Sequence, residues 1–261
     1  MSEAASGAAG HQEGRVGSVS KAARILAAFT PLVRMLSLRQ LERRTGIPRS
    51  TAHGLCLTLC DAGLLEEAPH RGYQLGPALV ALGGQVVDRT GLVDAADGVL
   101  ERAVRRDGTE AHLGQLVSGW VVYLERRSGR RPVPMNNRVG MRAPAHRTGC
   151  GKAALATLPT DEVTARVCTA CAADHLPMPD LDLLGRQLRR ARSAGFVINT
   201  DFQPGRTSVA APVVGRHGIV VGGVSVAGPT RLFGAAAMER TGMEIADVAA
   251  TIGAKLGGAA R

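Results

Sequence analysis

Two short helical stretches joined by a tight turn constrain this 261-residue chain more than any other feature. The first begins at Ser37, a suitable N-cap, and ends at Gly46, which suits the left-handed position after a helix. Only two residues separate it from a second stretch, from about Arg49 to Ala62. Such a pair is typical of the helix-turn-helix unit, whose second helix enters the major groove of DNA.

The start of the second stretch carries polar side chains suited to DNA. Arginine at position 49 suits guanine or phosphate, and the hydroxyls of Ser50 and Thr51 suit phosphate oxygens. Each residue alone has a simpler explanation. Ser50 or Thr51 can serve merely as a helix cap, and His53 can be a solvated surface residue. Their clustering at the opening of one helix favours contacts with bases and backbone.

The flanking segments complete a winged form of this unit. A helix is expected over Ser18–Phe29, with Ser18 or Ser20 as its N-cap, and Pro31 closes it. After the helix pair, residues 64–75 predict two short strands around a Pro69–Gly72 turn, which act as a wing or, alternatively, as a mere connecting hairpin. The residues expected to bind DNA are Ser37, Arg39, Arg49, Ser50, Thr51, His53 and Arg71.

Beyond the wing, strands and helices mix without βαβ regularity, so the fold class is α+β. The expected strands are Ala111–Val117, Trp120–Leu124, Val209–Val214 and Ile219–Val226, and the expected helices are Pro77–Gly91, Leu92–Arg106, Gly151–Leu158 and Leu181–Ser193. This organisation predicts a disordered tail over residues 1–14, a winged helix-turn-helix domain over 15–76, a linker helix over 77–91, and an effector-binding and oligomerisation domain over 92–261.

Composition limits the possible partners. A formal charge of +10 favours a polyanion, although of the 32 basic residues only Lys21, Lys152 and Lys255 are lysine, which is also what a GC-rich genome would produce. Aromatic residues make up 3% of the chain, too few for the stacking platforms of single-strand binders. No apolar run approaches the roughly 18 residues of a membrane span, and residues 1–14 lack the apolar core of a secretory signal. We therefore expect a soluble, cytoplasmic protein.

The five cysteines do not form a disulfide framework. Cys56 and Cys60, one helical turn apart, are expected to be core thiols. Cys168 and Cys171 have a spacing used by metal ligands, with Asp174 and His175 just after them, but no second pair accompanies them. Zinc binding and redox sensing remain alternatives to an incidental loop, which we favour, so neither a metal nor a cofactor is expected.

An ordered series of short motifs resembles the isocitrate-lyase-regulator (IclR) family of bacterial transcription factors. The series covers roughly residues 16–257. In the N-terminal third it comprises Ser37–Gly46 with the following Ile-Pro-Arg-Ser-Thr, Ala62-Gly-Leu-Leu-Glu and Tyr73-Gln-Leu-Gly. Downstream it comprises Gly140-Met-Arg-Ala-Pro-Ala-His, Gly151-Lys-Ala, Pro204-Gly, Ala210-Ala-Pro-Val and Ser225-Val-Ala-Gly-Pro. Each motif alone is weak, but their order is specific.

This resemblance implies a winged helix-turn-helix, a linker helix that helps the chain to dimerise, and a GAF/PAS-like antiparallel-sheet effector domain. It also implies homodimers, often paired into tetramers, on palindromic double-stranded operators, because two-fold symmetry in the protein requires it in the site. The residues that it implies for effector binding are Met135, Gly149, Cys150, Ile198, Arg206, Ser208, Ser225 and Ala227.

The residue types of that set suit an anionic effector. Backbone N–H groups at Gly149 and Gly151, before a helix, can hold a carboxylate, and Arg206 can form a bidentate charge pair. The chain departs from the family pattern at Thr200-Asp201, where a pair of acidic residues is common, and at Ser208, where a cysteine is common. It also has Gly54 where many members have arginine. These departures bear on the effector and on the operator sequence.

We therefore expect a regulator of a bacterial metabolic operon, acting by repression or activation, with a carboxylate, an aromatic acid or a polyol as effector. One alternative is a DNA-binding protein whose C-terminal domain serves only assembly, without a ligand. Another is an enzyme that uses Cys150 as nucleophile or His146 as base, but no acid–base constellation surrounds either residue in the sequence, so no enzymatic activity is expected.

Overall fold

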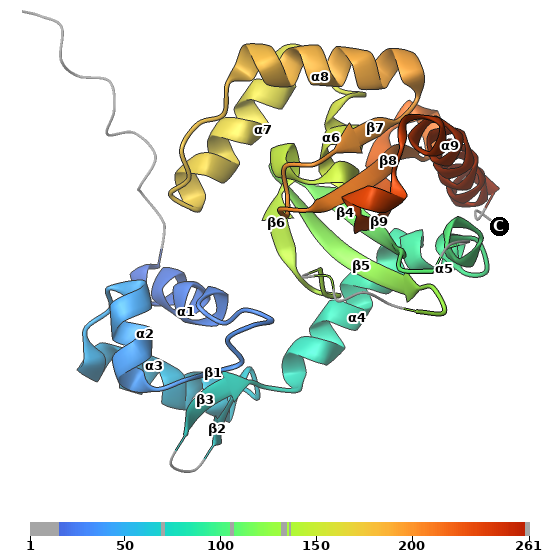
Figure 1. Ribbon diagram of the computed structural model, residues 1–261. Coiled ribbons are helices and arrows are strands. Elements are labelled where there is room, and N and C mark those ends of the chain that lie inside the picture. The colour runs from blue at the N-terminus through green and yellow to red at the C-terminus, as the bar shows by residue number, and fades with distance from the viewer. Residues whose placement is uncertain (1–15, 69–70, 105–106, 132–134, 136, 259–261) are drawn as a thin grey trace, which may run out of the picture. The chain divides into compact units, whose positions relative to one another are not determined.

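The computed structural model describes residues 16–68, 71–104, 107–131, 135 and 137–258. The predicted disordered tail over residues 1–14 lies outside these residues. The chain divides into two compact units, Met1–Gln85 and Val86–Arg261, and the division falls inside helix α4, Ala78–Thr90. We describe each unit by itself (Figure 1).

The N-terminal unit is a three-helix core with a small antiparallel sheet, coloured in blues in Figure 1. Its elements are α1 (Gly17–Ala27), β1 (Met35–Leu36), α2 (Leu38–Thr45), α3 (Arg49–Asp61), β2 (Leu65–Ala68) and β3 (Gly72–Leu75), with β3 in the middle of the sheet. Each of the three helices contributes a fully buried residue to this core: Ile25 from α1, Leu41 from α2 and Ala52 from α3. The expected cap of α1 is wrong, because Val16 occupies the N-cap without a side-chain hydrogen bond.

The turn between α2 and α3 has the predicted caps. Ser37 forms a capping box with Gln40: its Oγ accepts from the Gln40 backbone N–H at 3.4 Å, and Gln40 Oε1 accepts from the Ser37 N–H at 2.8 Å. Gly46 has φ +66°, a left-handed conformation in which glycine carries no steric penalty. These caps end α2 sharply and allow α3 to start three residues later.

Replacing Ser37 with alanine should lower the free energy of unfolding of the protein by about 1 kcal/mol, because the Gln40 backbone N–H loses its side-chain acceptor. Urea unfolding followed by circular dichroism measures this change. Threonine at the same position keeps a hydroxyl acceptor, so Ser37→Thr is the matched control. Equal losses in the two variants would show that the cap does not stabilise α2.

The C-terminal unit is built on a six-stranded, wholly antiparallel sheet in the order β6-β5-β4-β9-β8-β7. The strands are β4 (Glu110–Val117), β5 (Trp120–Ser128), β6 (Arg142–Pro144), β7 (Val197–Asn199), β8 (Arg206–Val214) and β9 (Val220–Pro229). The β4–β5 and β8–β9 pairs are joined at Ser118-Gly119 and Gly215–Gly218, between the strands expected from the sequence. The predicted α+β class is confirmed.

Helices cover both faces of this sheet (Figure 1). The helices are α5 (Leu92–Ala96), α6 (Gly149–Leu155), α7 (Thr160–Ala173), α8 (Leu181–Ala194) and α9 (Ala235–Gly258). One core lies between the sheet and α5 and α9, and includes Leu113, Val224 and Ile252. The other lies between the sheet and α6, α7 and α8, and includes Cys150 and Leu188. Alternate residues of each strand therefore face different cores.

Trp120, at the start of β5, anchors the end of α7. Its Nε1 donates to Asp174 Oδ2 at 2.8 Å, and Arg142 donates to the other carboxylate oxygen at 2.6 Å. The Arg142 guanidinium also stacks over the indole, 4.5 Å from the ring centre. Because Asp174 directly follows α7, this cluster attaches the helix to the edge of the sheet.

Several sequence predictions in this unit are corrected by the structure. The single helix expected over Leu92–Arg106 is wrong, because Gly98 adopts φ +68° and separates α5 from a 3₁₀ turn at Leu100–Ala103. The loop expected around Cys168 and Cys171 is wrong as well, since both lie in α7. The helix after His146 begins at Gly149 instead of Gly151, and α9 was not predicted at all.

Among the described residues, no helix combines the length and the apolarity needed to cross a bilayer. In the same residues, no three histidine, cysteine, aspartate or glutamate side chains gather in a way that can hold a metal ion.

Candidate functional site

The opening turn of α3 forms an exposed polar surface in the N-terminal unit. Arg49, Ser50, Thr51 and His53 are all exposed, whereas Ala52 on the same turn is fully buried. Pro48 is the N-cap and makes no side-chain hydrogen bond to the helix. Ser50 and Thr51 therefore do not cap α3, and its first N–H groups point outward beside their hydroxyls, where a phosphate can be bound.

The inner face of α3 explains this orientation. Ala52, Cys56 and Leu59 are buried at the spacing of one helical face. Burial raises the pKa of the Cys56 thiol to about 11, with a smaller contribution from Cys60, so the thiol is protonated and packs as an apolar group. The predicted core role of Cys56 fits this position, and Cys60 is half-buried beside the same core.

The three other residues expected to bind DNA occupy different settings. Arg39 is exposed on α2, and Arg71 is exposed beside Gly72 at the tip of the β2–β3 hairpin. Ser37 is half-buried, and its hydroxyl belongs to the capping box of α2. The Ser37 hydroxyl also donates to Gln40 Oε1 at 3.1 Å, so it has no free donor for a phosphate, and Ser37 acts on the position of α2.

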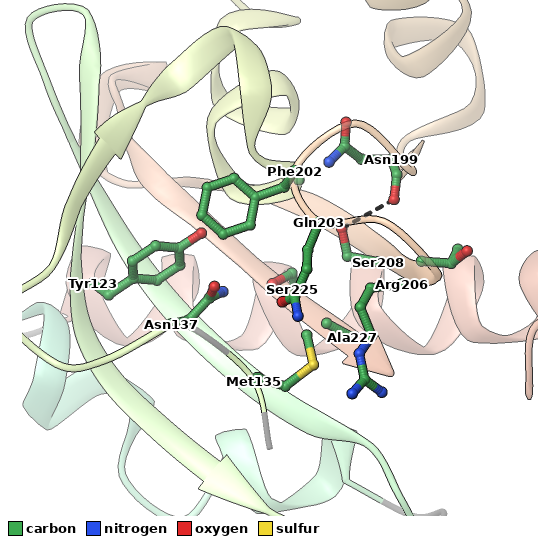
Figure 2. Close-up of a pocket in the computed structure, with 12 residues that line it drawn as sticks. Tyr123, Met135, Asn137, Asn199, Phe202, Gln203, Arg206, Ser208, Ser225 and Ala227 are labelled. Atoms are coloured by element: carbon green, nitrogen blue, oxygen red, sulfur yellow. Dashed lines mark hydrogen bonds between the residues drawn. The ribbon is translucent and has the colours of Figure 1, made fainter. Parts of the chain in front are cut away.

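In the C-terminal unit, a small cavity lies where β8 begins and β9 ends, next to the first residue of α6. Its volume is about 20 Å³. It is lined by Tyr123, Met135, Asn137, Gly149, Asn199, Phe202, Gln203, Arg206, Thr207, Ser208, Ser225 and Ala227 (Figure 2). We call it the effector pocket, after the family resemblance that implies effector binding for several of these residues. It brings together six of the eight residues that the family resemblance implies for effector binding.

Two of the expected residues lie elsewhere. Cys150 is buried in the core, where its Sγ donates to Ser225 Oγ at 3.2 Å. Ile198 is 44% exposed on β7, because alternation along the strand turns Asn199 inward and Ile198 outward. The expectation for the backbone of Gly151 is also wrong, since its N–H donates to Thr148 Oγ1 at 3.0 Å, which is the N-cap bond of α6.

Amide side chains give the pocket its polar character. Asn137 Oδ1, Asn199 Oδ1 and Gln203 Oε1 are buried acceptors without a hydrogen-bond partner in the described residues. Asn199 is held in place because its Nδ2 donates to the Arg147 carbonyl at 3.1 Å, and its own carbonyl accepts from Ser208 Oγ at 3.5 Å. Unpaired buried acceptors are costly, so the pocket suits a ligand that carries hydroxyl or N–H donors.

The remaining walls provide an apolar end and a cationic end. The rings of Tyr123 and Phe202 lie at one end of the pocket in Figure 2, and the Arg206 guanidinium lies at the other. Burial raises the pKa of the Tyr123 phenol well above its ordinary value and outweighs the opposite effect of its hydrogen bond with Thr148, so this group stays protonated. An aromatic ring that carries a carboxylate matches this arrangement.

A buried ionisable pair lies in the sheet beside the pocket. His112 pairs with Ser225 across β4 and β9, and its ring meets that of Tyr123 edge to face, with centroids 5.7 Å apart. Its Nε2 lies 3.4 Å from Glu110 Oε2. Burial opposes ionisation of Glu110, but His112 and then Arg126 outweigh it and lower the pKa of this carboxyl. The pair therefore places a carboxylate and an imidazole on β4, beside the strand β9 that carries Ser225 and Ala227.

Sequence patterns missed six of the pocket residues: Tyr123, Asn137, Asn199, Phe202, Gln203 and Thr207. Tyr123 was detectable in principle, because it shares one face of a predicted strand with Val121, and this strand pairs with the strand of His112. The loop residues Phe202 and Gln203 follow β7, a three-residue strand that no periodicity reveals.

The chemistry of Cys150 and His146 argues against the enzymatic alternative. Complete burial raises the pKa of the Cys150 thiol to about 11, so the nucleophilic thiolate is scarce near neutral pH. Burial, followed by the charges of Arg147 and Lys152, lowers the pKa of His146, and its Nδ1 has no partner in the described residues. The thiol of Cys150 is bonded to Ser225 and not to a base.

Both units match domain models of the same protein family. Residues 18–69 match the model of the IclR helix-turn-helix domain, and residues 84–254 match the model of the bacterial transcriptional regulator IclR C-terminal domain. The transcriptional regulator XynR of Escherichia coli is 30% identical over 80% of this chain and 84% of its own. The glycerol operon regulatory protein of Streptomyces griseus is 30% identical over 92% and 96%.

Solved structures show the same fold. An IclR family regulator from Brucella abortus aligns with a TM-score of 0.78 at 22% identity, covering 96% of each chain. An IclR homologue from Microbacterium hydrocarbonoxydans, in complex with 4-hydroxybenzoate, aligns with a TM-score of 0.74 at 25% identity, covering 92% of this chain and 99% of its own.

Proposed function

This chain belongs to the IclR family of bacterial transcriptional regulators, and we propose that it controls its target genes through a small aromatic or related organic acid bound in the effector pocket. Arg206 is proposed to pair with the carboxylate, and Ser208 and Ser225 to add hydrogen bonds to it. The ring would lie against Tyr123 and Phe202.

The composition of the effector pocket carries this proposal. A cationic end, an aromatic end and three unpaired buried amide oxygens require a ligand with an anionic group, a flat apolar body and at least one donor. A hydroxybenzoate has all three, and 4-hydroxybenzoate is the ligand in the structural relative from Microbacterium hydrocarbonoxydans. Aliphatic polyols lack the anion and the flat face, so we place them second.

The small volume of the pocket bears on how a ligand enters. About 20 Å³ holds little more than one water molecule, whereas a benzoate needs several times that space. Binding therefore requires movement of pocket side chains such as Phe202 or Gln203, which are half-buried. The same small volume favours the second candidate function, a DNA-binding protein whose C-terminal unit serves only assembly.

We also propose that the protein acts as a homodimer on a palindromic operator, each α3 reading one half-site. Helix α4 supports this, because none of its residues is buried although it carries several apolar ones. Val80 is 78% exposed, Leu82 53% and Val86 51%. Burial of such side chains against a second copy is favourable by about 1.5–3 kcal/mol for each fully buried residue. Pairing of two dimers into a tetramer would be detected by light scattering.

Replacing Arg206 with glutamine should weaken binding of 4-hydroxybenzoate at least tenfold, because a charge-assisted pair is replaced by a neutral hydrogen bond. Isothermal titration calorimetry on the purified full chain measures this change. The wild-type protein should bind the acid at one site per chain, and its melting temperature should rise with ligand concentration.

Arg231, exposed outside the pocket, provides the matched control: Arg231→Gln removes the same charge and should leave the affinity unchanged. A screen of aromatic acids that raises no melting temperature in the wild-type protein would favour the assembly-only function. Equal weakening by both substitutions would mean that the effect is one of net charge and not of the pocket.

A further inference from the structure

A second and larger cavity lies in the C-terminal unit, apart from the effector pocket. It has a volume of about 360 Å³. It lies between the residues that precede α6, the start of α8 and the segment that joins α7 to α8. The two cavities share no lining residue. We call this space the α7–α8 cavity.

Most charges at the α7–α8 cavity are already compensated. Lys152 is buried, with 3% of its surface exposed, and its Nζ forms an ion pair with Asp201 and donates to Gln187 Oε1 at 3.0 Å. Asp180 caps α8, since its Oδ1 accepts from the Leu183 N–H at 2.9 Å. Neither group therefore requires a ligand to balance it.

Arg147 is different. Its side chain lines the cavity and is exposed, and within the described part of the chain its guanidinium makes no hydrogen bond or ion pair. Its backbone carbonyl accepts from Asn199 Nδ2, which fixes the main chain at this position. The lowered pKa of the neighbouring His146 leaves that ring neutral near pH 7, so among the described lining residues Arg147 is the cation that has no carboxylate partner.

Half of the lining residues of the cavity are apolar and form what we call its apolar wall. It is formed by Leu176, Pro177, Met178, Pro179, Leu183 and Leu184. Met178 is 48% exposed and Leu183 46%, so apolar area remains in water that a ligand can cover. An unpaired guanidinium and an apolar wall that line one open space are the arrangement that binds an amphipathic anion.

We propose that the α7–α8 cavity is a second ligand site, which binds an aliphatic carboxylate. The carboxylate pairs with Arg147, and the hydrocarbon chain lies on the 176–184 wall. A flexible chain suits this wall better than a flat ring, because its surface comes from leucine, methionine and proline side chains and contains no aromatic residue. The site is open as it stands and requires no displacement of the Lys152–Asp201 pair.

Octanoate is a suitable probe, measured by isothermal titration calorimetry on the full chain below its aggregation concentration. The wild-type protein should bind one octanoate per chain, and Arg147→Gln should weaken that binding at least tenfold. Arg190→Gln, which removes an exposed charge from α8 outside both cavities, should leave the affinity within twofold of wild type. Octan-1-ol, with the same chain but no charge, should bind at least tenfold more weakly than octanoate.

Two further variants distinguish this site from the effector pocket and keep the test independent of the first substitution. Leu183→Asp places a charge in the apolar wall at an exposed position and should also abolish octanoate binding, with the melting temperature as the check on folding. Arg206→Gln should not change octanoate affinity. The proposal is overturned if the wild-type protein binds no octanoate, if Arg147→Gln binds it as well as wild type does, or if Arg206→Gln is the variant that loses it.

Discussion

Replacing Arg49 with alanine is expected to lower operator affinity by about 30-fold for each recognition helix that contacts the DNA. Arg49 is the first residue of α3 and is exposed, so its guanidinium can reach a guanine edge or a phosphate. Loss of one good bidentate contact costs about 2 kcal/mol. In the proposed dimer two helices lose it, and affinity should fall by about a thousandfold. A mobility-shift assay at fixed salt measures this effect.

The control for this experiment is Arg190→Ala, which removes one exposed positive charge from the other unit of the protein. It should change affinity by less than threefold. The salt dependence of binding separates the two kinds of contact that Arg49 can make, because loss of a phosphate contact reduces the slope of log K against log salt and loss of a base contact does not. Unchanged operator affinity in Arg49→Ala would remove α3 as the reading helix.

Replacing Gly151 with alanine is expected to destabilise the C-terminal unit by about 3 kcal/mol and to lower its melting temperature by about 10 °C. A Cβ at this position would lie 2.2 Å from the Ala145 carbonyl oxygen and 2.4 Å from the Ala145 Cα. Both are backbone atoms, so no side-chain rotation relieves the overlap. All seven residues of α6 are buried, which leaves the helix no room to shift. Thermal unfolding followed by circular dichroism measures the change.

Gly185 supplies the matched substitution. It lies inside α8, and the nearest atom that a Cβ at this position would meet is at the flexible end of Arg189, 3.4 Å away. Alanine is the better helix former, so Gly185→Ala should raise stability by up to about 1 kcal/mol. If both glycine substitutions changed the melting temperature alike, the close approach of α6 to Ala145 would not be the cause.

The N-terminal unit was predictable because its information is local. The caps of α2, the apolar face of α3 and the turn of the wing each occupy a few consecutive residues, and the structure has these elements within a residue or two of the predicted positions. The exposure of Arg49 follows from the burial of Ala52 and Cys56, which the helical period also gives.

The C-terminal unit was predicted less completely, because much of it is determined by contacts between distant segments. Helix α9 is rich in alanine and glycine, so its sequence has little contrast between faces, yet Ile245 and Ile252 are buried against β8 and β9. Helix α7 was mistaken for a loop because its cysteines suggested chemistry, although Cys171 is simply buried. Tertiary packing determines both helices.

The effector pocket shows the same limit at single residues. Resemblance pointed to Cys150 and Ile198, but strand alternation and helix register turn Cys150 into the core and Ile198 to the surface. Phe202 and Gln203 enter the pocket from a loop whose path depends on how β7 pairs with β8. Register between strands depends on long-range pairing, which local sequence patterns do not reveal for a strand of three residues.

The arrangement around Trp120 has a practical consequence. The sequence contains one tryptophan, so all indole fluorescence of the protein arises from this side chain. Stacking by Arg142 and the bond to Asp174 tie its emission to the junction of β5 with the end of α7, two residues before the apolar wall begins at Leu176. Emission spectra thus offer a label-free optical reporter of this corner of the molecule.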